Sequence, residues 1–451
     1  MKRLGLIAAA GVVAGGGFAL WQADRVASVA AGYFAKVSCS EIFVAGRSAS
    51  AVADGDFHGI SPAFDYLKYK IDPSEKFVTA SLFGFGGAKA IYRSGYGCTL
   101  VRGGAPEAVP ALTPIEGKPL PEAKAGTPAT RNDVDYAAIE RAMDAAFADK
   151  EAATRSILVV KDGAVLAERY AEGFTAQTPF LSWSMAKSVT ATMVGAAVLR
   201  GLIDIETPAP VAEWQGDKAR EAISWNNLLQ MQSGLAFDET YDDPNSDVSQ
   251  MLFRARDAGG VAARQKLAHA PGTFWSYSSG TTNLIQRTLR ETLEANDVGY
   301  HAFARDAVLG PLGAASFTLE PDASGTFIGS SFIYATARDW AKLGMLYLND
   351  GVVDGLRVLP EGWSRYVAAP ASASNAFYGA QFWLNHPGTD GRAKYMPGVP
   401  DEAYLMAGHE GQYVLIVPDK NMIIVRTGMT RSKAPMPAVA PAFAAIYAAV
   451  P

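Results

Sequence analysis

The chain has few of the residues that mark metal centres, disulfide frameworks and nucleic-acid-binding surfaces. Its 451 residues include only two cysteines and five histidines, and the formal net charge is −5. The histidines lie far apart, with no pair at helical i,i+4 spacing, so no metal site is expected. The negative net charge is unlike that of nucleic-acid-binding proteins, which usually carry an excess of basic residues. No repeat occurs at solenoid or propeller spacing, which excludes those architectures.

The two cysteines, Cys39 and Cys98, both lie in the first hundred residues and have neither lipobox nor metal-site spacing. Outside the cytoplasm they would form one disulfide. In a reducing compartment, two buried free thiols would be expected instead.

Residues 1–30 have the composition of a membrane anchor or a signal segment. A Lys-Arg pair precedes an uncharged stretch, residues 4–23, which is just long enough to span a bilayer. We expect an uncleaved inner-membrane anchor, with the basic residues in the cytoplasm and the body of the protein on the periplasmic or extracellular side. The alternative is a cleaved signal peptide with a site at Ser28-Val29-Ala30, which would make the protein secreted.

The remaining chain divides by composition into three parts. Residues 31–103 contain strand-like runs at 77–83 and 90–93 and predict a small β-containing segment. Residues 104–130 are rich in proline and predict an extended linker or strap. Residues 131–451 are long enough for one large two-layer domain, and 49% of the whole chain is hydrophobic, which suffices for a sizeable core. The sequence does not specify an oligomeric state.

The segment Ser184-Met185-Ala186-Lys187 places a serine and a lysine three residues apart where an apolar helix begins. Residues three apart share a helix face, so the hydroxyl of Ser184 and the amine of Lys187 should point the same way. A lysine whose pKa is lowered by burial can take the proton of the serine. In isolation, the pair is also typical of a helix N-cap serine followed by a solvated lysine.

Tyr277 lies in a Ser/Gly-rich loop before an apolar helix that begins at about Thr282. A tyrosine there could shuttle a proton to a leaving group, or it could be a packing residue with a satisfied hydroxyl.

Two apolar runs, 414–417 and 422–425, surround a short polar turn and predict a hairpin of buried strands. Just before them, His409 is a candidate site residue or an ordinary loop histidine, and Gly411 would let a substrate approach the first strand closely.

Together these motifs resemble the serine β-lactamase and penicillin-binding-protein superfamily, in its class C-like branch of esterases, D-aminopeptidases and 6-aminohexanoate-dimer hydrolases. The family carries Ser-x-x-Lys, then Tyr-x-Asn or Tyr-x-Ser, then Lys-Thr-Gly or His-x-Gly. Here these read Ser184-Met185-Ala186-Lys187, Tyr277-Ser278-Ser279 and His409-Glu410-Gly411. The resemblance covers roughly residues 130–450. It implies an α/β fold in which an antiparallel sheet flanked by helices packs beside a mainly helical lobe, with the active site in the cleft between them.

The resemblance also implies a mechanism of acyl transfer without a cofactor. Ser184 would attack a carbonyl, Lys187 would act as general base, and Tyr277 would relay a proton to the leaving group. The backbone N–H groups of Ser184 and Gln412 would form the oxyanion hole.

Ser279, His409 and Gly411 are expected to contact the substrate, and Trp383 is expected either in an acyl-binding wall or in the core. Ser279 stands where β-lactamases usually have Asn, and His409 where they usually have Lys. A neutral histidine offers less to a substrate carboxylate than a lysine does. We therefore expect a hydrolase for a small ester or amide. The alternatives are a D,D-peptidase or β-lactamase, and a catalytically weak relative that binds cell wall.

The acidic loop at residues 238–247 has two interpretations. It could favour a cationic or amine-bearing substrate near the cleft, although a solvated surface loop is the commoner case.

Overall fold

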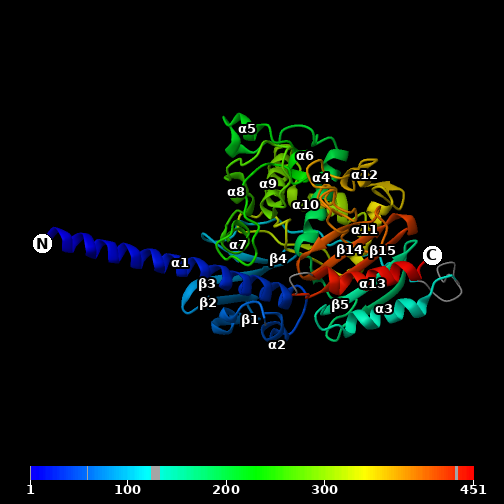
Figure 1. Cartoon of the computed structure of the whole chain (residues 1–451), viewed down its shortest axis with the longest axis horizontal. Coiled ribbons are helices and arrows are strands. Elements are labelled where there is room, and N and C mark those ends of the chain that lie inside the picture. The colour runs from blue at the N-terminus through cyan, green and yellow to red at the C-terminus, as the bar shows by residue number, and fades with distance from the viewer. Residues whose placement is uncertain (1, 58, 123–132, 432–434) are drawn as a thin grey trace.

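The computed structural model describes residues 2–57, 59–122, 133–431 and 435–451. Figure 1 shows a large α/β body and, beside it, a smaller N-terminal module from which one long helix projects. The module consists of helix α1 (Lys2–Phe43) and a four-stranded sheet, and the large body holds the three sequence motifs.

The central sheet of the large body is antiparallel, with strand order β12-β13-β14-β15-β5-β6. Its strands are β5 (Thr154–Lys161), β6 (Ala164–Tyr170), β12 (Trp383–Leu384), β13 (Tyr404–Gly408), β14 (Gln412–Val417) and β15 (Met422–Gly428). Strands β5 and β6 form one hairpin, and the hairpin predicted from residues 414–417 and 422–425 is confirmed as β14–β15. The first turns at Asp162-Gly163, where both residues have positive φ, as a two-residue turn between twisted strands requires.

Both faces of the sheet are covered, which explains why its strands are continuous apolar runs. Helices α3 (Tyr136–Ala148) and α13 (Pro435–Ala449) cover one face, where alternate residues such as Leu415 and Ile424 point. Helix α11 (Ala337–Leu348) covers the other face, where Val414 and Ile423 point.

The segment between β6 and β12 is mainly helical and forms the second lobe. Its helices are α4 (Ala186–Leu199), α5 (Lys218–Glu221), α6 (Trp225–Leu229), α7 (Asp247–Arg254), α8 (Ala258–Ala263), α9 (Ser279–Ala295), α10 (Tyr300–Ala304) and α12 (Trp363–Val367). A small sheet of order β7-β9-β8 (Phe180–Leu181, Ile333–Ala335 and Thr318–Leu319) lies where the lobe meets the central sheet. The predicted fold, an antiparallel sheet flanked by helices beside a helical lobe, is confirmed.

In the N-terminal module, α1 packs on one face of the sheet β1-β2-β3-β4. The strands span Leu67–Asp72, Phe77–Leu82, Phe85–Arg93 and Gly97–Val101. The predicted disulfide between Cys39 of α1 and Cys98 of β4 is present. It joins the helix covalently to the edge of its own sheet.

Helix α1 does not end at residue 30, where the sequence suggested a boundary between an anchor and the folded part. Ala27, Ser28 and Val29 are buried, and the helix continues to Phe43. Among the residues that the structure describes, no helix is both long enough and apolar enough to span a membrane.

A buried ion pair joins the module to the large body. Lys36 of α1 pairs with Glu320, and both side chains are almost fully buried. Glu320 also accepts hydrogen bonds from the Ser40 hydroxyl at 2.8 Å and the Cys98 backbone N–H at 2.5 Å. Buried charges persist only where their hydrogen-bonding capacity is satisfied, so the position of α1 on the large body is narrowly defined.

The described part of the predicted linker runs over the large body without helix or strand until Glu122, which bridges Val165. Backbone hydrogen bonds at Glu107 and Lys118 hold it there, as expected for a strap. Residues 123–130 of that predicted segment lie outside the described residues.

We expect the Cys39→Ser, Cys98→Ser double variant to unfold with a free energy lower by about 4 kcal/mol, because the crosslink closes a long loop in the unfolded chain. Denaturant titration in oxidising and reducing buffer measures this. Reductant should bring the parent to the level of the double variant and leave the variant unchanged. Equal stability of the two proteins in oxidising buffer would contradict the prediction.

Candidate active site

Ser184 lies in a single 3₁₀ turn, Trp183–Met185, between β7 and the buried helix α4. Trp183 has φ +44°, an uncommon conformation for a bulky residue, and the turn is held because the Ser182 backbone N–H donates to Ile333 O at 2.9 Å. The Trp183 indole N–H donates to Glu410 at 3.2 Å. The serine is thus presented, half-buried, at the start of an otherwise buried helix.

Lys187, one helical turn later, is buried beneath the serine. Its Nζ lies 2.9 Å from Ser184 Oγ, 2.9 Å from Ser279 Oγ and 3.2 Å from the carbonyl oxygen of Ser330. Burial lowers the pKa of Lys187 to about 8, against the opposing effect of the Glu239 carboxylate. At pH 7 about a tenth of the amine is therefore uncharged and can accept the Ser184 proton, and this share rises as the pH approaches 8.

Tyr277 stands on the other side of the serine. The centre of its ring lies 4.7 Å from Lys187 Nζ. Burial, with smaller effects from Tyr378 and Glu239, raises the pKa of Tyr277 well above its usual value, and the Ser184 hydroxyl slightly offsets this rise. The phenol is consequently protonated in the resting site, which suits a proton donor to a leaving group.

Ser279 is fully buried as the first residue of α9, on the far side of Lys187 from Ser184. Its hydroxyl donates to Glu239 Oε1 at 2.5 Å and its backbone N–H donates to Glu239 Oε2 at 2.8 Å. The sequence suggested a substrate contact for Ser279. That contact stays a prediction, and in the structure Ser279 links the lysine to a carboxylate.

Glu239 is therefore a site residue that sequence reasoning missed. It belongs to the acidic loop, but whereas Asp238 is exposed, Glu239 turns inward and is half-buried. Burial raises the pKa of Glu239, and Lys187 and the Ser279 hydrogen bonds lower it. The signal available in the sequence was Ser279 itself, since a serine is shorter than the usual asparagine and leaves room for a second side chain.

His409 is exposed at the mouth of the site, where it could meet a substrate. Its ring stacks on Tyr241 at 5.5 Å and meets Trp183 edge-on at 5.5 Å. The Tyr241 hydroxyl lies 3.4 Å from Ser279 Oγ, the hydroxyl that contacts Lys187. Tyr241, from the same loop as Glu239, is the second site residue that the sequence did not identify.

The His409-Glu410-Gly411 motif forms the tight turn between β13 and β14 rather than part of a strand. Glu410 and Gly411 both have positive φ, and a Cβ on Gly411 would come within 2.3 Å of the Arg426 guanidinium. The glycine is thus required by the turn and by Arg426. The approach of a substrate at Gly411 stays a prediction. At Gly408, a Cβ would lie 2.2 Å from Ser182 O, so only a glycine lets the two backbone segments come this close.

Gln412 begins β14 opposite Gly408. Its side-chain amide donates to the carbonyl oxygens of His409 at 3.2 Å and Gly428 at 2.6 Å, which fixes the turn. Gly408 pairs with Gln412 and lies against the backbone of Ser182, two residues before Ser184. This contact brings the start of β14 near the turn that carries Ser184. The oxyanion hole formed by their backbone N–H groups remains a prediction.

Trp383 is half-buried and contacts the Tyr277 ring at 5.2 Å. Trp275, Phe377 and Tyr378 pack around it. This aromatic wall lies beside Tyr277, the candidate proton donor. No three His, Cys, Asp or Glu side chains of the described ranges are placed to share a metal ion.

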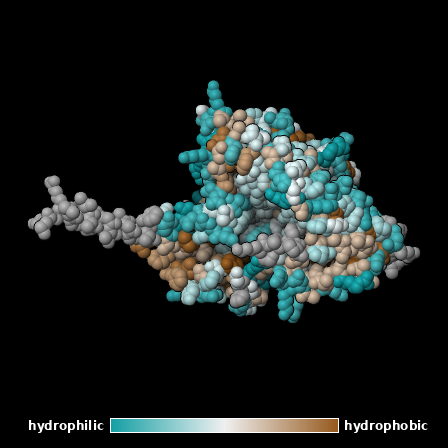
Figure 2. All heavy atoms as spheres, in the orientation of Figure 1, coloured by the Kyte–Doolittle hydropathy of each residue, from teal (hydrophilic) through white to brown (hydrophobic). Residues whose placement is uncertain are grey.

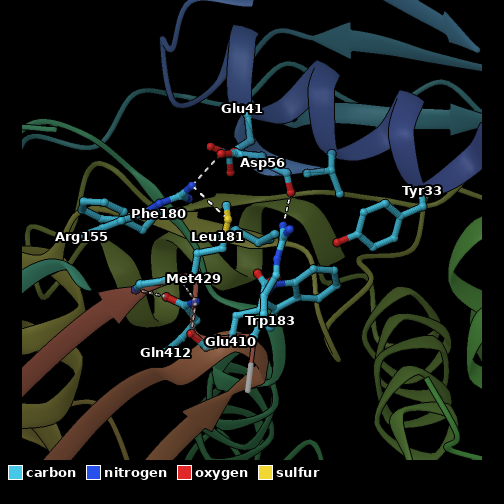
Figure 3. A pocket seen from close by; sticks show the side chains of 13 residues that line it. Tyr33, Glu41, Asp56, Arg155, Phe180, Leu181, Trp183, Glu410, Gln412 and Met429 are labelled. Carbon is cyan, nitrogen blue, oxygen red and sulfur yellow. Dashed lines mark hydrogen bonds and ion pairs between the residues drawn. The ribbon is translucent and has the colours of Figure 1, made fainter. Parts of the chain in front are cut away.

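A cavity of about 20 Å³ lies behind Trp183, between α1 and the turn of His409 to Gln412. Figure 3 shows Tyr33 of α1 reaching over Trp183 at this cavity, with Glu410 and Gln412 below. The Tyr33 and Trp183 rings are stacked at 6.1 Å, and Arg155 pairs with Asp56 of the module at 2.7 Å. The N-terminal module therefore supports the residue that precedes the candidate nucleophile.

Comparison with known proteins gives one family and several relatives. The family model described as Beta-lactamase matches residues 139–449. The 6-aminohexanoate-dimer hydrolase of Paenarthrobacter ureafaciens is 30% identical over 236 residues, which are 49% of this chain and 59% of that protein. The chain thus matches less than two thirds of that relative.

Two solved structures share the fold. The putative 6-aminohexanoate-dimer hydrolase from Bacillus anthracis has a TM-score of 0.56 at 20% identity, over 75% of this chain and 85% of that chain. A family VIII carboxylesterase has a TM-score of 0.54 at 15% identity, over 70% and 97%. The N-terminal module lies before the part of the chain that the family model matches.

We expect kcat/KM for a chromogenic ester to fall about tenfold for each pH unit below a pKa of about 8, because only neutral Lys187 can accept the Ser184 proton. The Glu239 carboxylate raises the pKa of Lys187, so Glu239→Gln should move this acidic limb to lower pH. The glutamine oxygen can still accept one of the two hydrogen bonds that Ser279 donates to the carboxylate.

The matched control for this pH profile is Asp238→Asn, which removes a neighbouring exposed carboxylate and should leave the limb in place. A limb that stays fixed or moves to higher pH in Glu239→Gln, or that shifts equally in Asp238→Asn, would refute the assigned link between Glu239 and Lys187.

Proposed function

The chain belongs to the beta-lactamase family, within the superfamily of serine β-lactamases and penicillin-binding proteins, and we propose that it is a serine hydrolase that cleaves an ester or amide bond through an acyl-enzyme on Ser184. The resemblance indicated by the three motifs is confirmed at the level of the family. One observation carries the proposal: the buried amine of Lys187 lies 2.9 Å from the hydroxyl of Ser184, and the ring of Tyr277 lies 4.7 Å from that amine.

The proposed reaction follows from these contacts. Ser184 Oγ forms a bond to the substrate carbonyl carbon while its proton passes to neutral Lys187, 2.9 Å away. As the carbonyl bond to the leaving group breaks, the Tyr277 hydroxyl donates a proton to the leaving oxygen or nitrogen. The proton held by Lys187 then restores the phenol. Water then attacks the acyl carbon and gives a proton to Lys187 and Tyr277. The bond between the acyl carbon and Ser184 Oγ breaks, the proton returns to Ser184, and the acid is released.

Ser279 and Glu239 set the starting state of Lys187. Ser279 Oγ accepts a hydrogen bond from the amine and donates one to the carboxylate, so it orients the amine towards Ser184. Glu239 stabilises the lysinium that forms during attack, because opposite charges in a buried site interact strongly. The catalytic base is thus connected to the Glu239 carboxylate through the hydroxyl of Ser279.

The surroundings of Ser184 support a small, largely uncharged substrate. Trp383, Trp275 and Tyr378 offer an apolar wall beside Tyr277. On the other side, the His409–Tyr241 pair stands where β-lactamases usually present a lysine to a carboxylate. The names of the curated and structural relatives, an amide hydrolase and a carboxylesterase, support the same two bond classes.

The location proposed for the enzyme is outside the cytoplasm. Its support is the Cys39–Cys98 disulfide, a bond that persists in oxidising compartments. We further propose that α1 is retained. Cleavage after Ala30 would remove the buried residues Ala27 to Val29 and the hydrogen bond from Gly86 N–H to Asp24 at 2.9 Å.

Retention of α1 is tested by intact mass measurement of the protein isolated from membrane and soluble fractions of the producing cell. We expect a mass that includes residues 24–30. A mature protein that begins at residue 31 would refute retention, and it would favour the secreted form.

The hydrolase proposal predicts that a fluorophosphonate adds one phosphonyl group to the protein and that the adduct is absent in Ser184→Ala. Lys187→Met should slow the labelling by about a hundredfold or more, because it removes the general base. Intact-protein mass spectrometry measures both, with penicillin as a parallel reagent.

Each outcome of the labelling experiment separates the candidate activities. A Ser184 adduct with the fluorophosphonate alone supports an esterase or amidase. A long-lived penicillin adduct would replace it with a penicillin-recognising peptidase. Protein that is folded by circular dichroism yet unreactive to both reagents would refute the hydrolase and favour a binding role for the cleft.

A further inference from the structure

The end of the N-terminal sheet formed by the β2–β3 turn carries exposed aromatic side chains. Phe83 is 64% exposed and Tyr66 60%, and their rings are in contact at 5.2 Å. Phe85, at the start of β3, is also exposed. Single exposed apolar residues are ordinary, but a contiguous group of them marks an interaction surface.

The same end of the module is the place where α1 leaves the folded body. Gly86, next to Phe85, donates its backbone N–H to Asp24 of α1 at 2.9 Å. Leu20 and Trp21, one helical turn earlier, are exposed. Figure 2 shows hydrophobic residues gathered at the foot of the projecting helix. Three segments of the chain thus form one patch, here named the aromatic end, which consists of Leu20, Trp21, Tyr66, Phe83 and Phe85.

A basic surface adjoins the aromatic end on the face of the sheet turned away from α1. Lys68 and Lys70 of β1 and Lys89 of β3 are exposed there around an open groove of about 510 Å³. The strands pair so that these lysines share a face with Phe85, since residues 85, 87 and 89 alternate with buried ones. Lys70 also forms an ion pair with Asp72 of the same strand, at 2.9 Å. We name the three lysines the lysine face.

We propose that the aromatic end and the lysine face rest together on the surface of an anionic lipid bilayer. Aromatic side chains favour the headgroup level of a membrane, and each lysine near an anionic surface strengthens the attraction about fivefold. The charge of the lysine face is complementary to such a surface.

The course of α1 identifies the bilayer as the occupant rather than a protein. The uncharged stretch, residues 4–23, continues in the same helix from the aromatic end outwards. An apolar segment and an aromatic patch that leave the body at one point would meet the same membrane. This surface takes no part in the hydrolytic reaction, so the proposal stands independently of the proposed function.

The experiment uses the full chain reconstituted in vesicles and a tryptophan reporter at the patch. Phe83→Trp is compared with Leu356→Trp, an exposed position in the large body, both in a Trp21→Phe background. Vesicles of phosphatidylcholine and phosphatidylglycerol contain bromine-labelled acyl chains, which quench tryptophans at short range. We expect quenching of the Phe83→Trp signal and none at Leu356→Trp, after subtraction of the background protein.

The lysines are tested in the Phe83→Trp protein by Lys68→Gln, Lys70→Gln and Lys89→Gln together. Quenching should fall to the level seen in vesicles of phosphatidylcholine alone, while hydrolysis of a soluble ester is unchanged. An unquenched reporter in anionic vesicles would overturn the proposal, even if α1 itself is inserted. Equal quenching in neutral and anionic vesicles would overturn the role of the lysine face.

Discussion

The structure depends on one costly arrangement, the burial of the Lys187 amine against the hydroxyl of Ser184. A lysine in the apolar interior loses its hydration, which lowers its pKa towards neutrality and makes it a base. The same burial demands partners for its N–H groups. Ser184, Ser279 and the carbonyl of Ser330 provide them from three different segments. Much of the helical lobe can be understood as the framework that brings these segments together.

A second constraint is the turn that presents the serine. Trp183 occupies a left-handed conformation that is unfavourable for its side chain, so the surrounding structure must hold it there. Glu410 accepts its indole N–H, Gly408 lets β13 approach Ser182, and Tyr33 stacks on its other face. Tyr33 comes from the N-terminal module. The module is therefore part of the support of the nucleophile, although the family model does not include it.

The sequence predicted the features that depend on local pattern. The Ser-Lys spacing and the apolar runs of β14 and β15 each encode their geometry within a few residues. Glu239 could not be identified in this way, because nothing local distinguishes the one inward-facing acid of its loop from its solvated neighbours. The continuity of α1 past residue 30 was also hidden. It depends on burial of Ala27 and Ser28 against β3 and of Val29 against α7, and both elements come much later in the chain.

The two departures from the usual family motifs are best understood as one adjustment. Ser279 is shorter than asparagine, and Glu239 fills the space beyond it and takes up its hydroxyl. His409 is planar where a lysine would be flexible, and Tyr241 stacks on its ring. Glu239 and Tyr241 belong to one loop, two residues apart. Compared with the usual family site, this site has no fixed positive charge at its mouth to bind a substrate carboxylate. It has instead the Glu239 carboxylate behind Lys187, where the charge acts on proton transfer.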